Sequence, residues 1–311
     1  MLRIPDPTER PTTSRALLIE RGGRAVAAAA LAVGRERGLV AVRHLGHAPN
    51  WFDPEPPAAH AEGRRELARA LIDQPGDLLV LEELSEASPL LAELRYLQPA
   101  MNVLPGPWTF RITSGGPRSR VTARRSEARR LVRRATDRGT PLLLTSTAQW
   151  SAIAPQLDEL LALQARMWEG READVFTGSP EGRGFVRAAI SGMGAENRVR
   201  LTRIDIGGRL GAFHLSLVWG TRAVVYKTAF DRRMEGLPGL GWASLLATVD
   251  LLTGEGVRTI DLGPWGGAYK SHIADGERTV TARVGLSPAG RLYLRAAAAK
   301  HGALDRIRRS I

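Results

Sequence analysis

Residues 221–254 read TRAVVYKTAFDRRMEGLPGLGWASLLATVDLLTG, and this stretch predicts a strand, a loop and a helix in that order. Thr221–Phe230 is rich in β-branched and aromatic residues, as strands are. Gly239–Gly254 has apolar residues at helical spacing, which we expect to form one buried face: Trp242, Leu245, Leu246, Val249 and Leu252.

The segments on either side extend this pattern. Val199–Ile206 and Leu210–Trp219 also resemble strands, and the Gly207-Gly208 and Gly220-Thr221 pairs between the runs indicate tight turns. The three strands therefore form an antiparallel meander. Arg258–Leu262 follows the helix, so we expect it to pair in parallel with a strand of the same sheet.

The remaining C-terminal elements are shorter or more regular. We expect a short helix or turn at Ala268–Ala274, a last strand at Thr279–Leu286, and a helix at Pro288–Arg309 that Gly302 interrupts.

The first half has a comparable pattern. Strands are predicted at residues 16–20, 25–33, 39–45 and 77–81, and a helix at residues 62–74. A strand at residues 141–145 would close this half. The predicted organisation is a flexible lead at residues 1–14, an N-terminal domain at 15–148 and a C-terminal domain at 149–311. The fold class is α/β, with mixed, mostly antiparallel sheets flanked by helices.

Composition excludes several kinds of chemistry. The chain has no cysteine, which excludes disulfides, a thiolate nucleophile and cysteine-bound zinc. No His-x-x-x-His pair or carboxylate cluster suggests a metal site. Neither a secretory signal nor an apolar run of about 20 residues is visible, so we expect a cytoplasmic protein without a membrane span.

Positive charge is concentrated in one segment. The chain carries 44 Lys and Arg against 32 Asp and Glu, a net charge of +12. Nine arginines lie within residues 117–139, and Arg130, Arg134 and Arg138 would share one helix face. The Arg118–Arg138 segment fits either a solvated helix with a thin apolar stripe or a helix that contacts phosphate or RNA.

The start of the helix after Phe230 is the strongest prediction of a binding site. Backbone N–H groups at a helix N-terminus attract anions, and glycine lets a pyrophosphate approach the backbone closely. Gly239 and Gly241 supply such glycines, although a lone Gly-x-Gly pair also occurs simply for turns and packing.

Five motifs in the second half, taken in order, resemble the cellulose-biosynthesis-associated (CelD-type) acetyltransferases. These have the GNAT fold and are similar to Fem-type aminoacyl transferases. The motifs are LLALQARMW at Leu160–Trp168, YKTAFD at Tyr226–Asp231, LPG at Leu237–Gly239, DLG at Asp261–Gly263 and AYK at Ala268–Lys270.

The first half is similar to the N-terminal half of the same family. The similarity lies in His44-Leu45-Gly46, in Trp51-Phe52-Asp53 and in the arginine-rich segment that ends at Asp137-Arg138-Gly139. The resemblance implies two tandem GNAT-like domains. The family usually has a longer segment before the first strands, so part of the acceptor side is expected to differ here.

The resemblance also implies transfer of an acyl group to an amine, with acyl-CoA (acetyl-CoA or a longer thioester) as the donor. Backbone N–H groups of Gly239, Leu240, Gly241 and Trp242 would then hold the pyrophosphate. The strand Val225-Tyr226-Lys227 would offer its backbone to the pantetheine arm. Tyr226 is equally compatible with a half-buried strand aromatic.

Direct transfer requires a deprotonated amine, a polarised carbonyl and a protonated leaving group. Tyr269 and Lys270 are the main side-chain candidates, and the resemblance implies a lysine at the place of Lys270. Lys270 is also compatible with a salt bridge to the other half. Asp261 fits either a base or a cap of the following turn.

His214 is the remaining candidate base. Strand alternation places it on the face opposite Phe213 and Leu215. It would serve as a base if that face lines the cleft, and otherwise it is a strand histidine whose hydrogen bonds are satisfied.

Three functions remain compatible with these patterns. The first is an N-acyltransferase that uses acyl-CoA and a small-molecule or peptide amine. The second is an aminoacyl-tRNA-dependent transferase, in which the Arg118–Arg138 helix would contact tRNA. The third is a non-catalytic GNAT pair that serves as a binding or scaffold protein.

Overall fold

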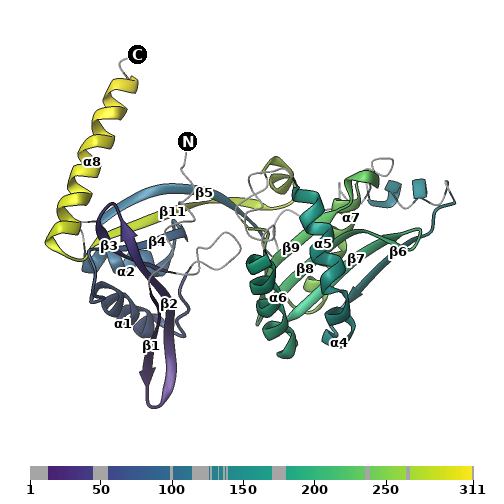
Figure 1. Ribbon diagram of the computed structural model, residues 1–311, viewed down its shortest axis with the longest axis horizontal. Helices are drawn as coiled ribbons and strands as arrows, with labels where there is room; N and C mark the ends of the chain where they lie inside the picture. Colours follow the sequence, from purple (N-terminus) through teal and green to yellow (C-terminus); the bar gives the residue numbers. More distant parts are fainter. Residues whose placement is uncertain are drawn as a thin grey trace. The chain divides into compact units, whose positions relative to one another are not determined.

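The computed structural model describes residues 13–44, 55–98, 101–113, 126–169, 180–234, 239–263 and 267–309. Within these ranges it leaves out residues 127, 132, 136 and 138. It also leaves out the side chains of residues 181, 267–269 and 300–309. Contacts divide the chain into two compact units, which are coloured by sequence in Figure 1. Unit 1 comprises residues 1–108 and 277–311, and unit 2 comprises residues 109–276.

Unit 1 is a sheet with helices on both faces. Its elements are β1 (Thr13–Arg21), β2 (Arg24–Glu36), β3 (Leu39–His44), α1 (Ala61–Ile72), β4 (Leu78–Ser85), α2 (Pro89–Leu97), the first part of β5 (Met101–Thr113), most of β11 (Asp275–Gly285) and α8 (Pro288–Arg309). The strand order is β1-β2-β3-β4-β11-β5. Leu67 of α1 and Leu91 of α2 are buried in its main core, whereas Leu294 of α8 packs against Ala41 and Val80.

Unit 2 also has helices on both faces of its sheet. Its elements are β6 (Leu142–Thr147), α4 (Trp150–Ile153), η2 (Ala154–Gln156), α5 (Leu157–Trp168), α6 (Pro180–Ala195), β7 (Val199–Ile206), β8 (Arg209–Trp219), β9 (Arg222–Phe230), η3 (Arg232–Met234), α7 (Leu240–Gly254), β10 (Thr259–Asp261) and η4 (Gly267–His272). With the end of β5, the strand order is β5-β10-β9-β8-β7-β6. Figure 1 shows α5 and α6 crossing the strands of this sheet.

The two units repeat one connection. In each, an antiparallel meander leads through a helix to a parallel neighbour: β3 through α1 to β4 in unit 1, and β9 through α7 to β10 in unit 2. The strand that completes each sheet comes from the other half of the sequence. In unit 1, β11 pairs with β4, and in unit 2, β5 pairs with β10.

Most predicted elements are confirmed, including the meander and the parallel pairing of β9 with β10. The predicted boundary between residues 148 and 149 lies inside unit 2 and stays a prediction. The strand at residues 141–145 does not close the first half, because β6 pairs with β7 in unit 2. Gly302 does not interrupt α8, whose helical turns continue to Arg309; one glycine costs a helix only about 1 kcal/mol.

The prediction of one buried face on α7 is also wrong. Its buried residues surround the helix, because Leu240 and Ala243 pack with Leu131 and Ala135, and Leu245 and Val249 pack in a second cluster with Ile273 and Ala274. Trp242 is only half-buried. Among the helices that the structure describes, none is long and apolar enough to cross a membrane.

Candidate functional site

Strands β9 and β10 share only a short stretch of pairing. Arg222, Ala223 and Val224 are in register with Thr259, Ile260 and Asp261, and β10 ends there while β9 continues to Phe230. The pairing between β9 and β10 therefore ends at Val224, and β9 continues beyond it.

A bulge in β9 lies just beyond this point. Leu215 of β8 faces Lys227, and the next residue, Ser216, faces Val225, so Tyr226 is the extra residue. A bulge bends its strand and increases the local twist. The residues predicted to carry the pantetheine arm, Val225-Tyr226-Lys227, are thus the residues of the bulge.

The first turn of α7 is built from glycine backbone. Gly239 occupies the N-cap with φ +106° and ψ 2°, a left-handed conformation that strains any side chain. Because the N-cap residue is a glycine, it makes no side-chain cap hydrogen bond to the first turn. A Cβ on Gly241 would meet only Cδ1 of Phe230, at 3.5 Å, so Gly241 is not required by packing. Leu237 and Pro238 lie outside the described residues.

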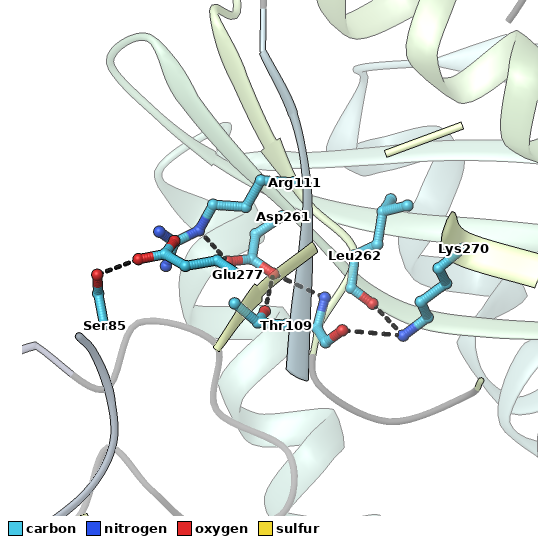
Figure 2. Close-up of polar contacts among 8 residues, drawn as sticks. Ser85, Thr109, Arg111, Asp261, Leu262, Lys270 and Glu277 are labelled. Atoms are coloured by element: carbon cyan, nitrogen blue, oxygen red, sulfur yellow. Dashed lines mark hydrogen bonds and ion pairs between the residues drawn. The ribbon is translucent and has the colours of Figure 1, made fainter. Parts of the chain in front are cut away.

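Asp261 holds the loop that follows β10. Its Oδ1 accepts a hydrogen bond from the backbone N–H of Gly263 at 2.7 Å and one from Thr109 at 3.3 Å. Its Oδ2 accepts from Nε of Arg111 at 3.0 Å, as Figure 2 shows. Gly263 has φ +74°, so the carboxylate stabilises a turn that favours glycine. The turn-capping interpretation of Asp261 matches this geometry.

Lys270, in η4, forms hydrogen bonds to the same loop. Its buried ammonium donates to the carbonyl oxygens of Leu262 and Gly263, the latter at 3.1 Å (Figure 2). Burial lowers the pKa of Lys270 to about 8, and the charge of Asp261 partly opposes this shift. At neutral pH the ammonium thus loses its proton more readily than that of an exposed lysine. The side chain of its neighbour Tyr269 lies outside the described residues.

His214 lies in β8 under α7, with 4% of its surface exposed. Nδ1 is 2.8 Å from the hydroxyl of Ser244, and Nε2 is 3.0 Å from that of Thr228. Burial, with a smaller contribution from the charge of Lys270, lowers the pKa of His214 to about 3. The imidazole is therefore neutral at physiological pH, with both nitrogens in hydrogen bonds. Thr228 and Ser244 were not singled out from the sequence, although each lies in a predicted element.

Tyr226 and Lys227 are buried within unit 2, with 5% and 2% of their surfaces exposed. The ammonium of Lys227 lies 4.8 Å from the centre of the Tyr226 ring, within the range of a cation–π interaction. Burial raises the pKa of the Tyr226 phenol, which stays protonated at neutral pH. Tyr226 is therefore more buried than the half-buried strand aromatic with which its sequence is compatible.

The described part of the arginine-rich segment has a thin apolar stripe. Leu131 and Ala135 are buried against Ile204 and Ala212, and four arginines are exposed: Arg129, Arg130, Arg133 and Arg134. Arg118 and Arg138 lie outside the described residues. Within the residues described, no group of three or more His, Asp or Glu side chains is placed to hold a metal ion.

Comparison with known proteins supports the fold of this site. Residues 122–271 match the family model described as an acetyltransferase (GNAT) domain, which spans β6 to η4 and includes β9, α7 and Lys270. The match covers slightly less than half of the chain. No curated protein matches.

Solved structures with a similar fold cover nearly the whole chain. The C-terminal domain of an Agrobacterium fabrum protein named as a lysylphosphatidylglycerol synthetase has a TM-score of 0.59 at 13% identity, covering 92% of this chain and 88% of that one. FemX has a TM-score of 0.58 at 10% identity, with 91% and 90% covered. A Bacteroides thetaiotaomicron protein of unknown function has a TM-score of 0.56 at 12% identity, with 87% and 86% covered.

The chain is thus a mixed α/β protein whose residues 122–271 match the GNAT acetyltransferase domain model, and FemX is among the solved structures with a similar fold. The family-model match supports the broader class of acyltransferase. The CelD-type family itself stays a prediction.

Proposed function

We propose that this chain transfers an acyl group from acyl-CoA to an amine by direct attack. The observation that carries the proposal is the end of the β9–β10 pairing at Val224, which leaves the rest of β9 unpaired with β10, together with a helix α7 whose N-cap is Gly239. A diphosphate is the kind of ligand that a glycine-rich helix start accommodates. An extended amide chain is the kind of ligand that a strand edge pairs with.

The reaction has a simple balance of bonds. The amine nitrogen attacks the thioester carbonyl, the carbon–sulfur bond breaks, and the leaving thiolate takes up a proton as the amine loses one. No enzyme nucleophile is needed. Coenzyme A carries the activated acyl group, and the protein must hold it and stabilise the oxyanion.

Among the four predicted catalytic residues, we assign Lys270 the main chemical role. A buried cation with a pKa of about 8 can stabilise an oxyanion or donate a proton near neutral pH. Asp261 would stabilise the turn at Gly263, whose carbonyl oxygen accepts a hydrogen bond from Lys270. Tyr269 lies in the same helical turn as Lys270, so we assign its phenol the role of proton donor to the leaving thiolate. His214 is better suited to positioning than to proton abstraction, because its pKa is so low.

Thermal melting with a series of acyl-CoA thioesters, from acetyl to octanoyl, tests this function. A ligand at one hundred times its Kd should stabilise the fold by about 2.7 kcal/mol, which is a measurable rise in Tm. A flat melting temperature across the whole series would contradict the proposal.

The exposed arginines of residues 126–139 favour a second candidate, aminoacyl-tRNA-dependent transfer. Exposed guanidinium groups at helical spacing suit a phosphate backbone. Charge reversal at Arg130, Arg134 and Arg138 should then release tRNA from the protein in a filter-binding assay. Unchanged retention, or no retention by the wild type, would remove this candidate.

A protein that binds acyl-CoA without transferring the acyl group would instead indicate the non-catalytic scaffold.

A further inference from the structure

His214 joins two elements of the candidate donor site through a chain of hydrogen bonds. Ser244 donates to the carbonyl oxygen of Gly241 at 3.3 Å. If that bond takes the only proton of the Ser244 hydroxyl, His214 donates to Ser244 from Nδ1. Nε2 of the neutral ring then accepts from Thr228. The chain therefore runs from Thr228 to His214, Ser244 and Gly241, with every donor matched to an acceptor.

The two ends of this chain lie where a donor would bind. Thr228 is on β9, two residues beyond the bulge at Tyr226. Gly241 is the second residue of α7, in the turn that would face the diphosphate.

The middle of this hydrogen-bond chain is shielded from water, whereas Thr228 and Gly241 at its ends are half-buried. Ser244 has no exposed surface, and His214 is almost fully buried. A buried hydroxyl or imidazole that loses its partner keeps its desolvation cost, so each member holds the others in place. Rigid buried networks of this kind fix the relative position of the elements that they join.

We propose that Thr228, His214 and Ser244 form a strut that positions the first turn of α7 against the bulged strand β9. The strut is a positioning device and does not contact the reacting atoms. This inference rests on the proposed function, because it gives the strut its purpose: to keep the diphosphate site and the pantetheine site at a fixed separation.

The test compares four variants of the full chain. Ser244→Ala and Thr228→Val each break the strut. Thr228→Ser keeps the hydroxyl. Thr248→Val is the matched control, because Thr248 is equally buried one turn further along α7, and its hydroxyl donates to the carbonyl oxygen of Ser244 without contacting His214.

Two measurements are made on each variant. The first is coenzyme A affinity by calorimetry, for which Ser244→Ala and Thr228→Val should be weakened about three- to tenfold, as expected for one lost hydrogen bond. Thr228→Ser and Thr248→Val should stay within about twofold of the wild type, since neither breaks the strut. The second is amide hydrogen exchange without ligand. It should be faster at residues 240–245 in the two strut-breaking variants, with residues 250–254 unchanged.

Two outcomes overturn the strut. One is unchanged exchange at residues 240–245 in both strut-breaking variants. The other is equal loss of coenzyme A affinity in Thr248→Val, which would show a general response of the helix to a lost hydroxyl. A wild type that binds no coenzyme A would overturn the proposed function instead, and the exchange measurement would still decide the strut.

Discussion

Asp261 and Lys270 hold the same residue from its two sides. The carboxylate accepts from the N–H of Gly263 at 2.7 Å, and the ammonium donates to its carbonyl oxygen at 3.1 Å. A carboxylate and an ammonium group thus hold the backbone of Gly263, a glycine in the left-handed conformation, in the loop that follows β10. The roles proposed for the two side chains depend on this arrangement.

Replacing Asp261 by Asn should separate a turn cap from a general base. Asn keeps an oxygen that can accept from the N–H of Gly263, but it loses the charge that pairs with Arg111. We expect kcat to fall less than tenfold, whereas loss of a general base costs about a hundredfold or more. Steady-state kinetics on Asp261→Asn and Asp261→Ala check this. A loss above a hundredfold in the Asn variant would restore the base assignment.

The charge on Lys270 predicts a pH dependence of stability. Its folded-state pKa of about 8 lies below its ordinary value of 10.5, so the unfolded chain binds more protons between these two values. The destabilisation from burying the ammonium is thus fully present below pH 8 and is lost as pH rises towards 10.5. Urea unfolding should show the stability of the wild type rising relative to Lys270→Met over that range. Parallel pH profiles of stability for the two proteins would contradict a lowered pKa of Lys270 in the folded state.

His214 should remain neutral throughout the physiological range. Its folded-state pKa of about 3 lies below the ordinary 6.5, so stability is fully present above pH 6.5 and is lost as pH falls towards 3. Nitrogen-15 NMR should show one neutral tautomer, protonated on Nδ1, between pH 5 and pH 8. In Lys270→Met the pKa should rise, because the nearby cation is gone, while burial keeps it below 6.5. A ring that titrates near pH 6.5 in the wild type would show that His214 is accessible to protons.

The two glycines of the α7 start should respond differently to alanine. Gly239→Ala places a side chain at φ +106°, with a cost of about 1–2 kcal/mol in unfolding free energy. Gly241→Ala should stabilise the free protein by up to about 1 kcal/mol, because alanine suits a helix and its Cβ has room. The same Cβ should weaken coenzyme A binding. Unfolding and calorimetry on both variants check this, and undiminished affinity in Gly241→Ala would make Gly241 a mere turn glycine.

Periodicity predicted the elements of unit 2 well, because strands such as β8 and β9 are regular and bounded by glycine turns. It missed β5, where Pro105 and Pro107 remove backbone donors and lower the strand propensity. It also misassigned β6, since the sequence does not show which strand pairs with which. The partner of each completing strand comes from far along the chain.

The candidate site was predicted less completely than the fold. The glycine start of α7 and the position of Lys270 were found from local motifs. The partners of Lys270 are backbone carbonyls, which no side-chain pattern reveals. The hydroxyls that satisfy His214 come from β9 and α7, and their meeting depends on tertiary packing.

A crystal structure with acetyl-CoA bound tests the central claim most directly. The account predicts the diphosphate within hydrogen-bonding distance of the backbone N–H groups at residues 240–242, and the pantetheine arm along β9 at residues 225–227. Coenzyme A bound elsewhere on the chain, or its absence from crystals soaked at saturating concentration with this surface accessible, would contradict it.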